Sequence, residues 1–155
     1  MADLAESDKA PPFDLIGDDG GRVKLSAYPG KAVVVYFYPK DDTSGCTLEA
    51  QEFTVAAKDF AAAGAVVIGI SPDSEDSHCR FKEKYGLGVT LAADPERKAI
   101  AAYGVWKEKS MYGRKYMGVE RSTFLIAPNR KIARVWRKVK VPGHAADVLT
   151  AVRVL

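Results

Sequence analysis

The chain has 155 residues, the size of one domain with a sizeable core. Charged residues make up 28% of it and the net charge is +3, which excludes a disordered chain and gives no support for nucleic-acid binding. Because no run of about 18 or more apolar residues is present, the sequence predicts no membrane span. The acidic N-terminal residues lack the apolar core of a signal peptide, so the two cysteines predict reactive thiols in the reducing cytoplasm.

The predicted elements begin after residues 1–12, which lack periodicity, end in two prolines and are expected to form a loose arm. A β-hairpin follows, because the turn sequence Asp-Asp-Gly-Gly separates two short apolar-polar segments. Two unbroken apolar runs then indicate central strands that are covered on both faces. In chain order, the strands predicted in the first 103 residues are Phe13–Ile16, Arg22–Leu25, Ala32–Tyr38, Ala65–Ile70 and Val89–Ala93.

Helices are predicted between these strands from apolar spacing and from capping residues. They run from Cys46 to about Ala63, from a cap at Asp73 or Ser74 to Tyr85, and from Asp94 to about Tyr103.

The last third of the chain begins with residues 104–121, a Gly-rich segment that is long for a loop and therefore a candidate functional loop. A second hairpin is predicted from Ser122–Ala127 and Ile132–Val139. Strands that alternate with helices, followed by a hairpin and a helix, predict one α/β domain with a mixed sheet. The terminal helix starts at Gly143, and its expected apolar stripe is Ala146, Leu149, Val152 and Val154.

One cysteine lies where a predicted buried strand turns into a predicted helix. Cys46 begins its helix only a short turn after Ala32–Tyr38. The first N–H groups of a helix have no internal partner, and the macrodipole places partial positive charge there. Both effects favour a thiolate over a thiol and therefore predict a reactive cysteine. The alternative is that Cys46 is a small buried apolar residue that happens to start a helix.

The residues around Cys46 support the reactive interpretation. Pro39 fixes the chain where the strand ends. Thr43 is placed to cap the first helical turn or to offer a hydroxyl beside the sulfur, and Glu49 lies within reach of the same turn. The apolar residues that follow Cys46 at helical spacing predict that it faces inward; they are Ala50, Phe53, Ala57 and Phe60.

The spacing of Pro39, Thr43 and Cys46 matches the Pro-x-x-x-Thr-x-x-Cys signature of peroxiredoxins. The longer run Tyr-Pro-Lys-Asp-x-Thr-x-Gly-Cys-Thr-x-Glu-Ala, in which Gly45 precedes the cysteine, resembles the PrxQ subfamily, also called the bacterioferritin comigratory proteins. That subfamily usually has proline where this chain has Ser44, a departure that removes no group with a chemical role. The likeness covers nearly the whole chain, and the later stretches that share it are Gly69–Ser74, Lys84–Leu87, Tyr103–Trp106 and Arg121–Ile126.

The resemblance implies a thioredoxin-like fold, with a mixed central sheet flanked by helices and an N-terminal hairpin. It also implies a thiol-specific peroxidase that reduces hydrogen peroxide and organic hydroperoxides, with Cys46 as the peroxidatic cysteine and a sulfenic acid as its first product. No metal, haem or flavin is expected for this reaction. The expected partners are a hydroperoxide and thioredoxin or a similar dithiol reductant, and the subfamily is often monomeric.

Arg121 is the second expected active-site residue. It opens the predicted strand Ser122–Ala127, and its planar fork can hold the thiolate and the peroxide oxygens together. In peroxiredoxins the arginine at this point of the pattern belongs to the active site, whereas the alternative is a solvated arginine at a strand end. Glu49 either orients Arg121 or is only a favourable acid in the first helical turn.

Cys79 is the candidate resolving cysteine. The subfamily often places this residue five positions after the reactive one, where this chain has Gln51, and in other members it lies in the following helix, as Cys79 does. Its position about 130° from the apolar stripe of that helix predicts an accessible side chain. A Cys46–Cys79 disulfide would then join an inward and an outward helix face, which requires local unfolding. The alternative is an incidental surface cysteine in a one-cysteine enzyme.

Other chemistries have less support. Neither His78, expected at the core boundary, nor His144, expected at a helix start, is spaced as the partner of a Cys–His protease. A metal site built from both histidines and both cysteines would lack a short-spaced ligand pair, and no nucleotide-binding glycine motif is present.

Two rival functions remain. One is a thioredoxin-like disulfide-exchange protein, although Glu49 stands where such proteins usually carry their second cysteine, and the other is a redox-sensing or chaperone-like binding module.

Overall fold

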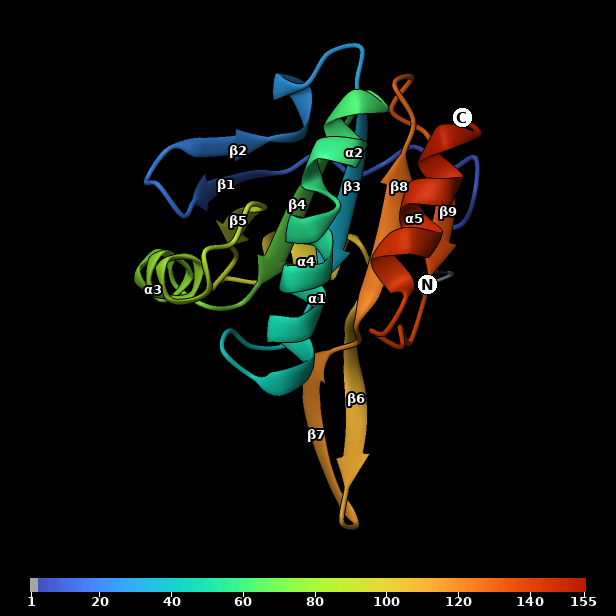
Figure 1. Cartoon of the computed structure of the whole chain (residues 1–155). Helices are drawn as coiled ribbons and strands as arrows, with labels where there is room; N and C mark the ends of the chain where they lie inside the picture. Colours follow the sequence, from blue (N-terminus) through green and yellow to red (C-terminus); the bar gives the residue numbers. More distant parts are fainter. Residues whose placement is uncertain (1–2) are drawn as a thin grey trace.

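The computed structural model describes residues 3–155, in which seven strands form one mixed sheet and two further strands form a separate hairpin (Figure 1). The main sheet has the strand order β2-β1-β5-β4-β3-β8-β9. Its strands are β1 (Asp14–Gly17), β2 (Arg22–Lys24), β3 (Ala32–Phe37), β4 (Ala65–Ser71), β5 (Thr90–Ala93), β8 (Ser122–Ile126) and β9 (Ile132–Trp136). The separate hairpin consists of β6 (Trp106–Met111) and β7 (Arg114–Val119).

Strand β3 is the centre of the sheet, and every one of its residues is buried. It runs parallel to β4 and antiparallel to β8, so Val34 lies opposite Val67 on one side and Leu125 on the other. A continuous apolar run suits this position because both faces of the strand are covered by other elements. The predicted mixed sheet and its central strand are therefore present.

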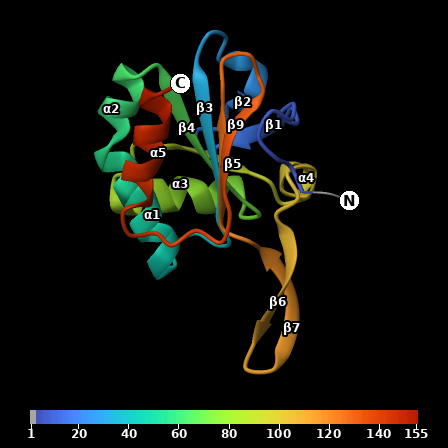
Figure 2. The ribbon, with the colours of Figure 1, turned by 90° about the vertical axis from the view of Figure 1, so that its right-hand side faces the viewer.

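Helices cover both faces of the main sheet (Figure 2). On one face, four helices pack around Phe53, Phe60 and Phe81. On the other face, the short helix α4 packs with the β1–β2 hairpin around Tyr103. The helices are α1 (Ser44–Val55), α2 (Ala57–Ala62), α3 (Glu75–Tyr85) and α5 (His144–Arg153) on the first face and α4 (Lys98–Ala102) on the second, and a 3-10 turn, η1 (Leu25–Ala27), follows β2.

The start and end of α3 were predicted correctly. The Ser74 side chain caps the helix by accepting a hydrogen bond from the Ser77 amide at 3.1 Å, and Gly86 ends it in the left-handed conformation. The helix that begins near Cys46 is broken at Ala56, whose backbone leaves helical geometry, so α1 and α2 replace one continuous helix.

The expected loose arm is wrong for the part of it that the structure describes. The Ser7 amide donates to the Ile132 carbonyl at 2.8 Å, and the Ala10 amide donates to the Arg130 carbonyl at 2.9 Å. Lys9 forms an isolated bridge with Lys131, and Ala10 is buried. One short bridge produces no sequence periodicity, so the pattern could not show that this segment lies along β9. Residues 1–2 of the arm lie outside the described residues.

Two further elements differ from their predictions. Residues 104–121 contain the β6–β7 hairpin, which projects from the main sheet at the same end as the start of α1 (Figures 1 and 2). Because most of its residues are partly or fully exposed, the hairpin shows little hydrophobic alternation.

The helix expected from Asp94 begins only at Lys98, since Arg97 has a positive φ and the Asp94 carboxylate accepts from the amides of Lys98 and Ile100.

The apolar stripe expected for the terminal helix was partly misplaced. Ala146 is exposed and Val154 follows the end of α5, with 80% of its surface exposed. The residues that α5 buries are His144, Ala145, Val148, Leu149, Ala151 and Val152. In residues 3–155, no helix is both long and apolar enough to cross a membrane.

Candidate active site

Cys46 lies in the first turn of α1, just after the loop that leaves the central strand β3. Its residue surface is only 1% exposed, and it packs in the core cluster with Tyr36, Ala50 and Phe53. The inward orientation predicted from the helix periodicity is therefore correct. At the start of the helix, the unpaired amides and the macrodipole favour negative charge on the sulfur.

Arg121 connects the end of the β6–β7 hairpin to β8 and reaches the sulfur. Its Nη2 atom donates a hydrogen bond to the Cys46 Sγ at 3.1 Å. Its Nη1 atom donates to the Glu49 Oε1 at 2.6 Å, so one guanidinium group joins the cysteine and the carboxylate. A Cβ atom at Gly45 would lie 3.2 Å from the Arg121 Nη2, so a side chain there would crowd the guanidinium. Of the two interpretations of Glu49, this geometry supports the one in which it orients Arg121.

The carboxylate of Glu49 is almost completely buried. Burial raises the pKa of Glu49 to about 7, although the charge and hydrogen bond of Arg121 act in the opposite direction. Burial of Arg121 works to lower its pKa, but Glu49 and Cys46 outweigh that effect and the pKa is raised. Arg121 is therefore a permanent cation between two groups that can carry negative charge.

Thr43 and Pro39 shape the loop before the cysteine. Within the described chain, the Thr43 side chain makes no cap on α1, although the residue occupies the N-cap position. Its hydroxyl instead donates to the Lys40 carbonyl at 2.8 Å and closes the loop on itself. The predicted cap is therefore wrong: the hydroxyl is turned toward the Lys40 carbonyl and accepts from no amide of α1. Pro39 is half-buried at the end of β3.

Cys79 lies on the exposed face of α3, as its helical angle predicted. Cys46 is buried and Cys79 is exposed, and both are free thiols. The structure therefore brings Cys46, Arg121 and Glu49 together but leaves Cys79 outside this group.

Comparison with known proteins places the chain in a family. Residues 7–135 match the AhpC/TSA family. Peroxiredoxin Bcp of Bacillus subtilis is 50% identical over 145 residues, which cover 94% of this chain and 92% of the relative. The chain belongs to the AhpC/TSA family, in its peroxiredoxin Bcp branch. The resemblance to peroxiredoxins that the sequence carries is thereby confirmed.

Solved structures of peroxiredoxins share the fold. A Xylella fastidiosa PrxQ structure has a TM-score of 0.93 at 37% identity and covers 99% of this chain and 98% of its own. A structure of the Xanthomonas campestris bacterioferritin comigratory protein, from a study of its alkyl peroxide reduction activity, has a TM-score of 0.87 at 42% identity and covers 92% of this chain and 90% of its own. The predicted thioredoxin-like fold is confirmed by these neighbours.

Sequence reasoning missed Tyr36, which forms part of the wall around the peroxiredoxin site. Its ring stacks on Phe53 with a centroid separation of 4.8 Å, and it lies opposite Gly69 in the neighbouring strand. A Cβ at Gly69 would lie 2.6 Å from the Tyr36 ring, so the glycine makes room for the tyrosine. Burial, followed by the charges of Glu49 and Cys46, raises the pKa of Tyr36 well above its usual value. A glycine inside a buried strand was the available signal for this close approach.

Lys109 on the projecting hairpin was also missed. Burial and the nearby charge of Arg121 lower the pKa of Lys109, while Cys46 and Glu120 act in the opposite direction. These effects place Lys109 within electrostatic reach of the cysteine. No sequence signal marked it, because the hairpin itself was not predicted.

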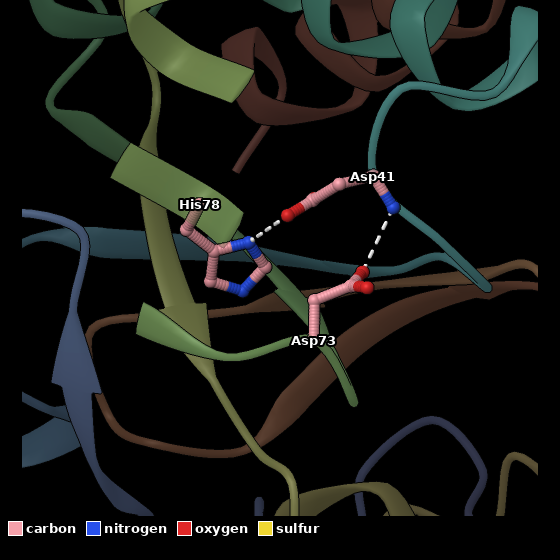
Figure 3. Close-up of side chains that lie close together, drawn as sticks. All are labelled: Asp41, Asp73 and His78. Carbon is pink, nitrogen blue, oxygen red and sulfur yellow. Dashed lines mark hydrogen bonds and ion pairs between the residues drawn. The ribbon is translucent and has the colours of Figure 1, made fainter. Parts of the chain in front are cut away.

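The two histidines of this peroxiredoxin are both buried. His144 begins α5 as expected, and its Nε2 lies 2.7 Å from the Thr123 hydroxyl. Burial lowers the pKa of His144 to about 4, although Asp147 acts in the opposite direction. His78 was expected at the boundary of the core, and that prediction is wrong because the residue is 0% exposed. Its burial is tolerated because each ring nitrogen has a polar partner, the Asp41 carboxylate (Figure 3) and the Ala92 carbonyl.

Candidate ligand atoms of Asp41, Asp73 and His78 lie within 4.8 Å of one another. The atoms that face each other already form hydrogen bonds: the His78 Nδ1 with the Asp41 Oδ2, and the Asp41 amide with the Asp73 Oδ2 (Figure 3). Since His78 and both carboxylates already have hydrogen-bond partners, the donor set fits a hydrogen-bond network better than a metal site.

Proposed function

We propose that this peroxiredoxin is a thiol peroxidase that reduces hydrogen peroxide and small organic hydroperoxides through Cys46. The observation that carries the proposal is the hydrogen bond from the Arg121 Nη2 to the Cys46 Sγ at 3.1 Å, at the start of a helix. A neighbouring cation favours the thiolate, which is the form that attacks a peroxide, over the thiol.

The first step follows from this arrangement. The Cys46 thiolate attacks one oxygen of the hydroperoxide, the O–O bond breaks, and the departing oxygen takes a proton and leaves as water or an alcohol. The cysteine is left as a sulfenic acid. Arg121 can stabilise both the thiolate and the negative charge that develops on the departing oxygen, because its fork has several donors. Glu49 holds the fork in place through the 2.6 Å bond to Nη1.

The second step uses Cys79 as the resolving cysteine. Its thiol attacks the sulfenic sulfur, water leaves, and a Cys46–Cys79 disulfide forms. A disulfide needs Cα atoms about 4.4–6.8 Å apart. Since Cys46 is buried and Cys79 is exposed, we expect local unfolding before the bond closes. Thioredoxin or a similar dithiol protein in the cytoplasm would then reduce the disulfide of the monomer.

The relatives support the substrate class. The Xanthomonas campestris protein of this branch was studied for alkyl peroxide reduction, and its structure covers 92% of this chain. Two rival functions have less support. A disulfide-exchange protein would carry a second cysteine at the position of Glu49, but that side chain is buried and paired with Arg121. A binding module would not need Arg121 held against the sulfur, and a redox sensor with the same reactive thiol would lack sustained turnover with a reductant.

Stopped-flow mixing of the reduced protein with a range of peroxide concentrations tests the proposal, with mass spectrometry of the products. We expect fast oxidation at micromolar peroxide, one equivalent of peroxide per chain, and a mapped Cys46–Cys79 disulfide. Slow oxidation combined with fast reduction of a disulfide substrate would favour the exchange protein. Slow oxidation without either activity would favour the binding module.

A further inference from the structure

The residue next to Cys79 is one of the most deeply buried polar groups of the molecule. Consecutive helical positions are about 100° apart, so α3 turns His78 into the protein while it turns Cys79 toward solvent. His78 is 0% exposed. Any movement that unwinds α3 at Cys79 and carries this cysteine toward Cys46 must also displace His78 from its site.

Both ring nitrogens of His78 face hydrogen-bond acceptors. Its Nε2 lies 3.1 Å from the Ala92 carbonyl, and its Nδ1 lies 2.7 Å from the Asp41 Oδ2. A carbonyl oxygen accepts only, and an ionised carboxylate accepts only, so the arrangement is satisfied fully when both nitrogens carry a proton. His78 and Asp41 then form a buried pair of opposite charges.

Asp41 belongs to the loop that leads into Cys46, and its carboxylate has further partners. It accepts from the Tyr38 hydroxyl at 2.6 Å and from the Ser77 hydroxyl at 2.8 Å. Its amide donates to the Asp73 Oδ2 at 2.8 Å, just before α3 begins (Figure 3). The loop before one cysteine is therefore bonded, in the core, to the helix that carries the other.

Asp42, the next residue of the loop, provides a second and weaker connection to α3. It accepts from the Lys84 ammonium at 2.8 Å and from the Tyr85 hydroxyl. The Lys84 side chain is 59% exposed and the Asp42 side chain 43%. Exposed ion pairs contribute little to stability because water and salt screen them. Breaking the buried Asp41–His78 contact costs far more, because buried polar groups would lose a hydrogen-bond partner that water cannot replace in the core.

We propose that Asp41 and His78 form a latch, two positioning residues that hold α3 folded against the Cys46 loop and that must separate before Cys79 can reach Cys46. The latch rests on the proposed function and deepens it, because it acts on the resolving step. While it is closed, Arg121 and Cys46 keep the geometry that suits attack on peroxide. Its opening sets the rate of disulfide closure.

The latch determines how the sulfenic acid is divided between two products. With the latch open, the Cys79 thiol displaces water from the sulfenic acid and gives the disulfide. With the latch closed, a second hydroperoxide can transfer an oxygen to the sulfenic acid, which gives a sulfinic acid and releases water or an alcohol. A tighter latch therefore favours sulfinic acid at high peroxide.

The test compares Asp41→Asn with Asp42→Asn, the same substitution on the neighbouring residue of the loop. Each reduced protein is mixed with one equivalent of peroxide, and disulfide closure is followed by rapid quenching and mass spectrometry. Since the negative charge that faces His78 and two hydroxyls in the core is removed, we expect closure on the order of tenfold faster in Asp41→Asn, less sulfinic acid at excess peroxide, and faster amide exchange in residues 75–82. Asp42→Asn, which weakens only the exposed connection, should change all three measurements much less than Asp41→Asn does.

General loss of stability is controlled by Tyr103→Phe, which removes a partly buried hydrogen bond to the Pro11 carbonyl on the other face of the sheet. If this variant shifts the product ratio as much as Asp41→Asn at an equal loss of thermal stability, the latch is refuted. Unchanged closure and exchange in Asp41→Asn would refute it as well. If Asp41→Asn does not fold, Ser77→Ala removes one bond to Asp41 and should change the ratio in the same direction, and no change there overturns the proposal.

Failure of the latch and failure of the proposed function give different results. If the wild-type protein accumulates sulfenic acid and never forms the Cys46–Cys79 disulfide, the resolving role of Cys79 is wrong. The amide exchange of the reduced Asp41→Asn and Asp42→Asn proteins then still decides whether Asp41 holds α3 in place.

Discussion

The two cysteines of this chain have the same side chain in opposite surroundings. Cys46 is buried at the start of α1, with the guanidinium of Arg121 against its sulfur. Cys79 is exposed in the middle of α3, among charged residues of the helix surface. The difference fits the roles proposed for them, a peroxidatic thiol in a fixed charge environment and a resolving thiol that is accessible. The predictions below change one side of this comparison at a time.

The largest effect is expected from Cys46→Ser. A hydroxyl in place of the thiol cannot attack peroxide at a useful rate, so peroxide consumption should be abolished. The measurement is the rate at which the reduced protein consumes its first equivalent of peroxide, and Cys79→Ser serves as the matched control because it keeps Cys46 for this step. A rate near that of the wild type in folded Cys46→Ser would contradict the proposed function.

For Cys79→Ser, we expect one equivalent of peroxide to be consumed before turnover stops. The site that contains Cys46, Arg121 and Glu49 is intact in this variant, but no thiol on α3 is available to resolve the sulfenic acid. Mass spectrometry should find a Cys46 sulfenic acid or a disulfide between two chains. Normal turnover with thioredoxin would instead show a one-cysteine enzyme in which Cys79 is a bystander.

Arg121→Ala should slow peroxide reduction by about 10²-fold or more, because one preorganised charged donor is removed from the reacting atoms. Arg134→Ala is the matched control, since Arg134 stacks over the Trp136 ring away from this group of residues. Arg121→Lys should recover only part of the rate, because an ammonium cannot reproduce a planar fork that contacts the sulfur and Glu49 together. Equal rates for Arg121→Ala and the wild type in folded protein would make Arg121 structural.

The smallest effect concerns stability as a function of pH. The pKa of Glu49 is raised from 4.5 to about 7 by burial, so the folded state holds this proton more tightly than the unfolded state. The stability that the proton contributes is fully present below about pH 4.5 and is lost as the pH rises through about 7. Urea unfolding at a series of pH values should show this loss in the wild type and not in Glu49→Gln.

His144 should act in the opposite direction over nearly the same range. Its pKa is lowered from 6.5 to about 4, so its contribution to stability is present above about pH 6.5 and is lost as the pH falls through about 4. A His144→Gln variant should therefore lose less stability at acidic pH than the wild type does. Identical pH profiles for the wild type and both variants would show that neither buried group titrates as described.

Much of the fold and of the site followed from local patterns. Unbroken apolar runs predicted β3 and β4, the turn sequence predicted the β1–β2 hairpin, and Ser74 and Gly86 marked the ends of α3. The β6–β7 hairpin, in contrast, was not predicted. The hairpin of residues 104–121 is exposed on much of its surface, so it lacks the alternation that reveals a half-buried strand.

The sequence by itself determined that Cys46 starts a helix after a buried strand and faces inward, and that Cys79 faces outward on another helix. Helical periodicity and capping act over a few residues, so these properties are written in neighbouring positions. Only the tertiary structure decided that Glu49 holds Arg121 against the sulfur and that His78 is buried against Asp41. Those contacts join residues 72 and 37 positions apart, and no local pattern encodes which distant polar groups meet when the sheet and its helices pack.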